Sequence, residues 1–197
     1  MSNTNLLIVF YSTYGTNHAI AAEAAKAAEE AGASVRLRRI AETAPAEVVN
    51  SQDGWKAQAE KAATVDLVSE ADLEWCNGLF ISSPTRYGGM ASQTRAWLDT
   101  LGGLWMRGAL AGKTLSAAAT AQNKNGGAEG AIQQTYVSSM HFGMIPVAPG
   151  YGDPIKFEDG GNPYGFVMQP GELTDTLKKS IHYQIKRQID ITSKLAA

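Results

Sequence analysis

The chain has 197 residues, of which 44% are apolar and 18% are charged, and its formal net charge is −2. A chain of this length can bury a sizeable core, so we expect one domain over residues 1–197. The near-neutral balance excludes the basic footprint of a nucleic-acid-binding protein, and no apolar run approaches the ~20 residues that span a bilayer.

Apolar runs and helical patterns alternate from the N-terminus onward. Residues 6–10 are continuously apolar, which predicts a strand buried on both faces of a sheet. The alanine-rich stretch that follows predicts a helix, with Thr16 or Asn17 as its N-cap and Gly32 as its stop. Residues 34–38 alternate polar and apolar side chains, so we expect this strand at a sheet edge.

The middle of the chain repeats the same alternation. The apolar run 78–83 predicts a third strand, and residues 92–101 predict the helix after it. The small residues 114–120 predict a fourth strand, followed by a helix over 129–142.

The C-terminal part completes the pattern. Residues 144–148 predict a fifth strand, and Pro146 places it at the opposite edge of the sheet. The last helix, over 172–195, has an apolar residue at every fourth position, which indicates a buried stripe. These residues are Leu173, Leu177, Ile181, Ile185 and Ile189.

Strands that alternate with helices predict an α/β fold with right-handed crossovers. We therefore expect a doubly wound, five-stranded parallel sheet with helices on both faces. Residues 41–61 and 149–171 are long for connections in such a fold, and long connections in compact domains are usually functional or mobile.

Three polar or glycine-rich segments each directly follow a predicted strand. We name residues 12–17 the first loop, 84–89 the second loop and 120–127 the third loop. In an open parallel sheet the carboxyl ends of the strands lie together, and ligands bind in the crevice outside them. The three loops therefore predict one binding site.

The first loop runs straight into a helix. Its hydroxyl and backbone N–H groups, with the positive end of the helix dipole, would bind a phosphate dianion without a lysine or arginine. An ordinary Ser/Thr-capped helix entry explains the same residues. Gly112-Lys113-Thr114 resembles the end of the phosphate-binding loop of nucleoside triphosphatases. It precedes a strand instead of following one, however, and Gly108 is one residue too close to Gly112 for that motif. We therefore exclude a nucleoside triphosphatase.

The second loop contains a glycine pair, Gly88 and Gly89, which lets the backbone approach a flat ring closely. Thr85 and backbone N–H groups would then satisfy the polar edge of that ring. The alternative is a surface turn with a solvated Arg86.

Five short motifs occur in order along the chain. They are Tyr11-Ser12-Thr13-Tyr14-Gly15, Pro84-Thr85-Arg86-Tyr87-Gly88, Gly102-Gly103-Leu104-Trp105, His141-Phe142-Gly143-Met144 and Gly161-Asn162-Pro163-Tyr164-Gly165. Together they resemble the WrbA family of flavodoxin-like NAD(P)H:quinone oxidoreductases. The resemblance spans essentially the whole chain, and its second and third motifs distinguish it from electron-carrier flavodoxins.

The resemblance implies a flavodoxin-like sheet of strand order 2-1-3-4-5 in a homotetramer that binds one FMN per subunit. It also implies an oxidoreductase that takes hydride from NAD(P)H and reduces quinones to hydroquinones by two-electron transfer. A flat slot over the ring, with Trp105 and Tyr87 as its walls, would let donor and acceptor bind in turn, which predicts ping-pong kinetics. The positions carried over for the cofactor are Ser12, Thr13, Tyr14, Gly15, Thr16, Asn17, Pro84, Thr85, Arg86, Tyr87, Gly88, Thr120, Ala121, Gln122, Asn125, Gly126 and His141.

The resemblance also implies roles in catalysis. Tyr14 matches a position that contacts nicotinamide, and Trp105 and His141 match residues beside the exposed face of the flavin ring. Without the family, Trp105 suits a core or interface residue and His141 suits a C-terminal helix cap. The third loop departs from the family's hydroxyl- and glycine-rich run and is one residue longer, so its contacts with a cofactor stay open.

Two other functions are compatible with a bound flavin. One is a one-electron flavodoxin carrier without a substrate of its own, although such carriers are usually strongly acidic. The other is a structural FMN protein. We favour an FMN-dependent NAD(P)H dehydrogenase (quinone). His18 and His182 lack metal-ligand spacing, so no metal is expected.

The cysteine content and the N-terminal residues give an expectation for the cellular compartment of the protein. Cys76 is the single cysteine and cannot form an internal disulfide. The first five residues lack the basic and apolar segments of a signal peptide. We therefore expect a cytoplasmic protein.

Overall fold

The computed structural model of the chain describes residues 4–195. The expectation of no signal peptide falls largely on residues 1–3, which lie outside this part. None of the helices described between residues 4 and 195 is both long and apolar enough to cross a membrane.

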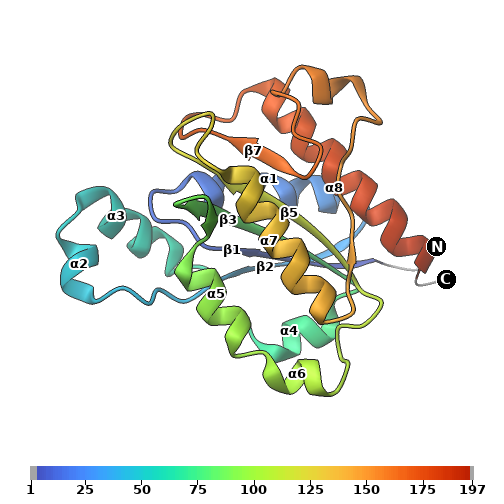
Figure 1. Ribbon diagram of the computed structural model, residues 1–197, viewed down its shortest axis with the longest axis horizontal. Helices are drawn as coiled ribbons and strands as arrows, with labels where there is room; N and C mark the ends of the chain where they lie inside the picture. Colours follow the sequence, from blue (N-terminus) through green and yellow to red (C-terminus); the bar gives the residue numbers. More distant parts are fainter. Residues whose placement is uncertain (1–3, 196–197) are drawn as a thin grey trace.

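One sheet forms the centre of the molecule (Figure 1). Its main path runs β2-β1-β3-β5-β6, and neighbouring strands on this path are parallel. The bounds are β1 Asn5–Phe10, β2 Ser34–Arg39, β3 Gly78–Arg86, β5 Thr114–Thr120 and β6 Ile145–Pro146. The expected doubly wound sheet, its order 2-1-3-4-5 and the edge position of β2 are confirmed. Within the described residues the sheet has seven strands in place of the expected five, because two short strands pair outside this path, one of them β4 (Gly89–Met90) on β3.

The edge opposite β2 differs from the expected fifth strand. β6 has two residues in place of the expected five, and it pairs with the start of β5 at Thr114 and Leu115. A second short strand, β7 (Phe166–Met168), pairs with the end of β5. Pro146 removes a donor from the ladder. The chain then leaves the sheet and returns to it at β7, which the sequence did not reveal.

Helices cover both faces of the sheet (Figure 1). α1 (Thr16–Glu30) and α8 (Asp175–Leu195) pack on one face. The other face carries α4 (Glu70–Trp75), α5 (Ser92–Asp99), α6 (Gly102–Met106) and α7 (Ala128–His141). The apolar residues of β1 divide accordingly: Leu6, Ile8 and Phe10 face α1 and α8, whereas Leu7 and Val9 face the other layer. Burial of both faces explains the continuous apolar run.

Residues 41–61, expected as a long connection, contain two helices, α2 (Ala46–Asn50) and α3 (Asp53–Ala62). They extend beyond the sheet at one end of the molecule (Figure 1). α4 and α6 are also additional to the expected helices. The short polar sequences of α2 and α3 carry little apolar periodicity, so their helical structure depends on tertiary contacts.

The segment 149–171 is anchored to α8 rather than free. Its short helix η1 (Pro154–Phe157) carries Lys156, which is 1% exposed and pairs with the buried carboxylate of Asp159. Ser180 of α8 donates to the same carboxylate. Asp153 accepts a hydrogen bond from the Ile155 N–H at 2.9 Å and caps η1.

Candidate functional site

A pocket of about 360 Å³ opens at the carboxyl ends of β1, β3 and β5, where the three loops meet. We name it the strand-end pocket. It is lined by Ser12, Thr13, Tyr14, Thr16, Asn17, Trp55, Pro84, Thr85, Arg86, Thr120, Ala121, Gln122 and Pro170. Among these described residues Arg86 is the only charged one, so the pocket favours an anion.

The first loop presents backbone donors to this pocket. Gly15 is the N-cap of α1, with φ +100° and no side-chain cap. Thr16 and Asn17 were the expected caps and lie instead inside the first turn. The first N–H groups of a helix have no intrahelical partner, so they are available to a ligand. The Ser12 hydroxyl accepts from the Gly15 N–H at 3.0 Å and fixes the turn.

Asn17, in the first turn of α1, forms hydrogen bonds with β3 and β5 at the floor of the pocket. It is 2% exposed, and its amide donates to the Thr120 hydroxyl at 2.7 Å and accepts from the Ser82 hydroxyl at 3.1 Å. Buried polar groups that are fully paired in this way hold a unique geometry. The ends of β1, β3 and β5 are therefore fixed relative to one another.

The second and third loops pack backbone against backbone. A Cβ on Gly127 would lie 2.5 Å from the Gly88 Cα, so only glycine fits there. The Thr85 hydroxyl is within 3.2 Å of the Gly127 carbonyl and donates to it. Tyr87, next to this contact, has φ 51° and is fully exposed.

Glu42, just after β2, fixes the position of Trp55, which lines the pocket beside the first loop. One of its carboxylate oxygens accepts from the backbone N–H groups of Thr43 and Ala44 and from the amide of Gln93. The other accepts from the Tyr11 hydroxyl at 2.8 Å and from the Trp55 indole N–H at 2.9 Å. Burial alone would raise the pKa of Glu42, but these hydrogen bonds outweigh it and lower the pKa.

A directed chain of hydrogen bonds links this carboxylate to Arg86. The Arg86 guanidinium donates to the Thr13 hydroxyl at 2.6 Å, and Thr13 donates to the Tyr11 hydroxyl at 3.3 Å. Tyr11 in turn donates to Glu42. Each hydroxyl has one proton, so the carboxylate at the end of the chain sets the direction of every bond in it. The Arg86 side chain is thus held over the first loop.

The strand-end pocket brings together most residues predicted for the cofactor. Gly15, Tyr87 and Gly88 lie within or next to its loops without lining it. Asn125 lines a different cavity, on the far side of the third loop. Gly126, in the same loop, packs against Ala121 and Asn123.

Trp105 and His141 lie elsewhere in the chain. α5 and α7 run back along the sheet from the loops, so α6 and the end of α7 reach the amino ends of the strands (Figure 1). Arg107, beside Trp105, pairs with Glu74 of α4, and the chain after His141 joins the start of β5. Within one chain neither residue lines the strand-end pocket, so their contact with the cofactor stays a prediction. Both side chains are exposed, Trp105 at 54%.

Two lining residues were not predicted. Trp55 comes from α3, and Pro170 follows β7. Each lies in one of the two long connections, whose length was the only sequence signal for them. Within residues 4–195, no group of three His, Cys, Asp or Glu side chains is placed to hold a metal ion.

Comparisons with known sequences place the chain among flavin enzymes. The model of the NADPH-dependent FMN reductase family matches residues 6–152. A Deinococcus radiodurans protein named NAD(P)H dehydrogenase (quinone) is 50% identical over 192 residues, which are 96% of each chain. A protein of the same name from Geotalea uraniireducens is 36% identical over 97% of this chain and 98% of that protein.

Solved structures with this arrangement are flavodoxins and their relatives. A flavodoxin, WrbA-like protein from Agrobacterium tumefaciens superposes with a TM-score of 0.69 at 16% identity, covering 98% of this chain and 99% of that one. Oxidised flavodoxin 1 from Bacillus cereus gives a TM-score of 0.60 at 12% identity, covering 93% and 97%. At these identities the likeness shows the fold, which is flavodoxin-like.

Proposed function

Because the chain belongs to the family of NADPH-dependent FMN reductases, within its NAD(P)H dehydrogenases (quinone), we propose that it is an FMN-dependent oxidoreductase that reduces quinones with NAD(P)H. The observation that carries this proposal is the strand-end pocket. It lies at the switch point of a doubly wound sheet, and no carboxylate is among its described lining residues.

The residues of the pocket fit FMN. The first loop offers the hydroxyls of Ser12 and Thr16 and the free N–H groups of α1, a donor set suited to a phosphate dianion. Pro84, Ala121 and Pro170 give flat apolar surface for a ring. Trp55 adds an aromatic wall, and Glu42 fixes its indole N–H.

When bound, FMN would supply the redox chemistry, taking up a hydride and passing two electrons to a quinone. The chain contributes orientation and electrostatics. Arg86 keeps one positive charge beside the first loop. The Tyr14 hydroxyl, held by Gln52 at 2.5 Å, marks the open side of the pocket where a second ring enters. No described lining residue of the single chain is a carboxylic acid or a histidine, so within one chain the protons for the quinone come from solvent at that side.

We further propose a cytoplasmic homotetramer in which a neighbouring subunit brings Trp105 and His141 to the open side of the pocket. Trp105, Met106 and Met140 are large apolar side chains that one chain leaves exposed. Such side chains gathered near the ends of α6 and α7 suit an interface between copies. This arrangement gives both residues a place beside the ring that the single chain does not.

The kinetic test concerns one slot shared by both substrates. If NAD(P)H and quinone bind in turn to one face of the flavin, double-reciprocal plots at several fixed quinone concentrations will be parallel. High quinone will then inhibit competitively against NAD(P)H. Intersecting lines would instead indicate a ternary complex. Negligible turnover with every quinone at full FMN occupancy would favour an electron carrier.

Replacing Trp105 with Ala tests the proposed assembly. Aromatic pairs contribute about 0.5–1.5 kcal/mol beyond burial, so kcat/KM should fall roughly three- to tenfold while FMN binding is kept. Sedimentation velocity should show a tetramer for the wild type that FMN favours. Val48→Ala, an exposed apolar change on α2, is the control. A wild-type monomer with full flavin affinity would rule out the assembly.

A further inference from the structure

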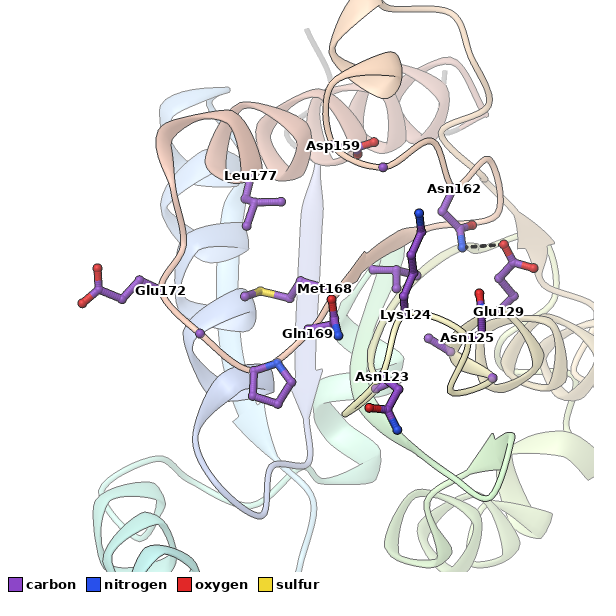
Figure 2. Close-up of a pocket in the computed structure, with 17 residues that line it drawn as sticks. Asn123, Lys124, Asn125, Glu129, Asp159, Asn162, Met168, Gln169, Glu172 and Leu177 are labelled. Atoms are coloured by element: carbon purple, nitrogen blue, oxygen red, sulfur yellow. Dashed lines mark hydrogen bonds between the residues drawn. The ribbon is translucent and has the colours of Figure 1, made fainter.

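A second cavity, which we name the side cavity and which Figure 2 shows, shares two lining residues with the strand-end pocket. Its volume is about 710 Å³, within the range of pockets that hold small ligands. The third loop separates the two cavities, and Ala121 and Pro170 line both of them. A ligand that leaves the strand-end pocket on this side can therefore continue into the side cavity.

The walls of the side cavity differ in chemistry. Met168 and Leu177 lie on one side of it and Lys124 and Asn162 on the other (Figure 2). Gln169, with its amide, lies between them (Figure 2). An apolar wall with a few amide groups suits a flat heteroaromatic ring that has hydrogen-bonding edges.

The side cavity offers one cation to a ligand. Lys124 is the only Lys or Arg among its described lining residues, and no described ion pair engages it. Of the three lining carboxylates, Asp159 is committed to Lys156 and Ser180. Glu129 accepts a hydrogen bond from the Asn162 amide at 3.1 Å and keeps its charge, whereas Glu172 points away from the cavity (Figure 2). The contact proposed below therefore depends on Lys124 itself and not on an excess of positive charge in the cavity.

We propose that the side cavity binds the adenosine half of NADPH and that Lys124 contacts its 2′-phosphate. This inference rests on the proposed function. The strand-end pocket, at about 360 Å³, has room for the flavin but not also for a whole dinucleotide. The distant half of the dinucleotide must therefore lie outside it, and the side cavity adjoins it. The wall of Met168 and Leu177 receives the adenine ring. Lys124 supplies a positive charge to the 2′-phosphate, a group that NADH lacks.

Lys124 is then a specificity-determining residue, and steady-state kinetics test it. Lys124→Ala should raise KM for NADPH roughly five- to twentyfold, and Lys124→Glu should raise it further, because a partly exposed charge-assisted contact is lost or reversed. KM for NADH should change less than twofold and kcat should be kept with both donors. The control is Lys194→Ala, which removes the same charge at the far end of α8. Equal effects on the two donors, or none, would overturn the assignment.

A binding measurement separates this inference from the proposed function. Adenosine 2′,5′-bisphosphate, titrated by calorimetry into the FMN-loaded protein, should bind the wild type and the Lys194→Ala variant. It should bind Lys124→Glu at least tenfold more weakly, and adenosine 5′-monophosphate should bind all three weakly and alike. This readout needs no turnover, so it stands even if no quinone is reduced. Equal binding of the bisphosphate to all three proteins would refute the site.

Discussion

Replacing Ser12 and Thr16 together with alanine should weaken FMN binding by roughly 150- to 1,000-fold. Hydrogen bonds to a charged group contribute about 1.5–3 kcal/mol each, and we take the lower part of that range because both side chains are half-exposed. No lysine is among the described lining residues to make up the loss. The Ser12 change also frees the Gly15 N–H and loosens the turn. Quenching of flavin fluorescence during titration of the apoprotein measures the effect.

The matched control replaces Ser51 and Thr64 with alanine. These hydroxyls lie in or beside α2 and α3 and donate only to backbone carbonyls at helix ends. They should leave the flavin dissociation constant within twofold of wild type. A double variant of the first loop with unchanged affinity would mean that the phosphate is bound elsewhere.

Replacing Lys156 with methionine should destabilise the fold by about 3–5 kcal/mol, because it leaves the Asp159 carboxylate buried without its cation. For a domain of this size, that corresponds to a fall in Tm of about 6–20 °C. The side chains of Lys156 and Asp159 are 1% and 3% exposed, so solvent cannot replace the lost partner. Chemical denaturation and calorimetry both measure the loss.

Two further variants test the cause. Lys178→Met breaks a pair whose side chains are 44% and 95% exposed, and it should cost less than about 0.5 kcal/mol. Adding Asp159→Asn to Lys156→Met removes the uncompensated charge and should restore part of the stability. A single Lys156→Met variant within 1 kcal/mol of wild type would show that the buried pair is not what anchors the segment to α8.

The sequence pattern alone predicts the sheet and the place of the strand-end pocket. Buried runs such as residues 6–10 are continuous because helices cover both faces of the sheet, and that pattern is local. The turn residues that end β1, β3 and β5 are local too. Parallel strands bring their carboxyl ends together by topology, so the three loops could be joined into one pocket before any contact was known.

Details of the helices and edges needed the tertiary structure. β7 has three residues, too few for a periodic signal, and it forms because Phe166 packs fully buried against α1 and α8. α8 has a second stripe beside its apolar one, in which the amides of Gln184 and Gln188 donate to carbonyls of the sheet. Glutamine at such spacing indicates a solvated face, and only the packing shows that it is buried.

The walls of the site were likewise decided by tertiary structure. Glu42 and Trp55 are 13 positions apart in a polar connection, and nothing local shows that their side chains meet at 2.9 Å. For Trp105 and His141 the motifs suggest a place at the site, but the single chain puts them elsewhere. The helices that carry them run antiparallel to the strands and bring them to the other end of the sheet. Sequence patterns report which residues share one element or one strand end. Where side chains from separate elements meet depends on how those elements pack, because packing sums many weak contacts that no local pattern records.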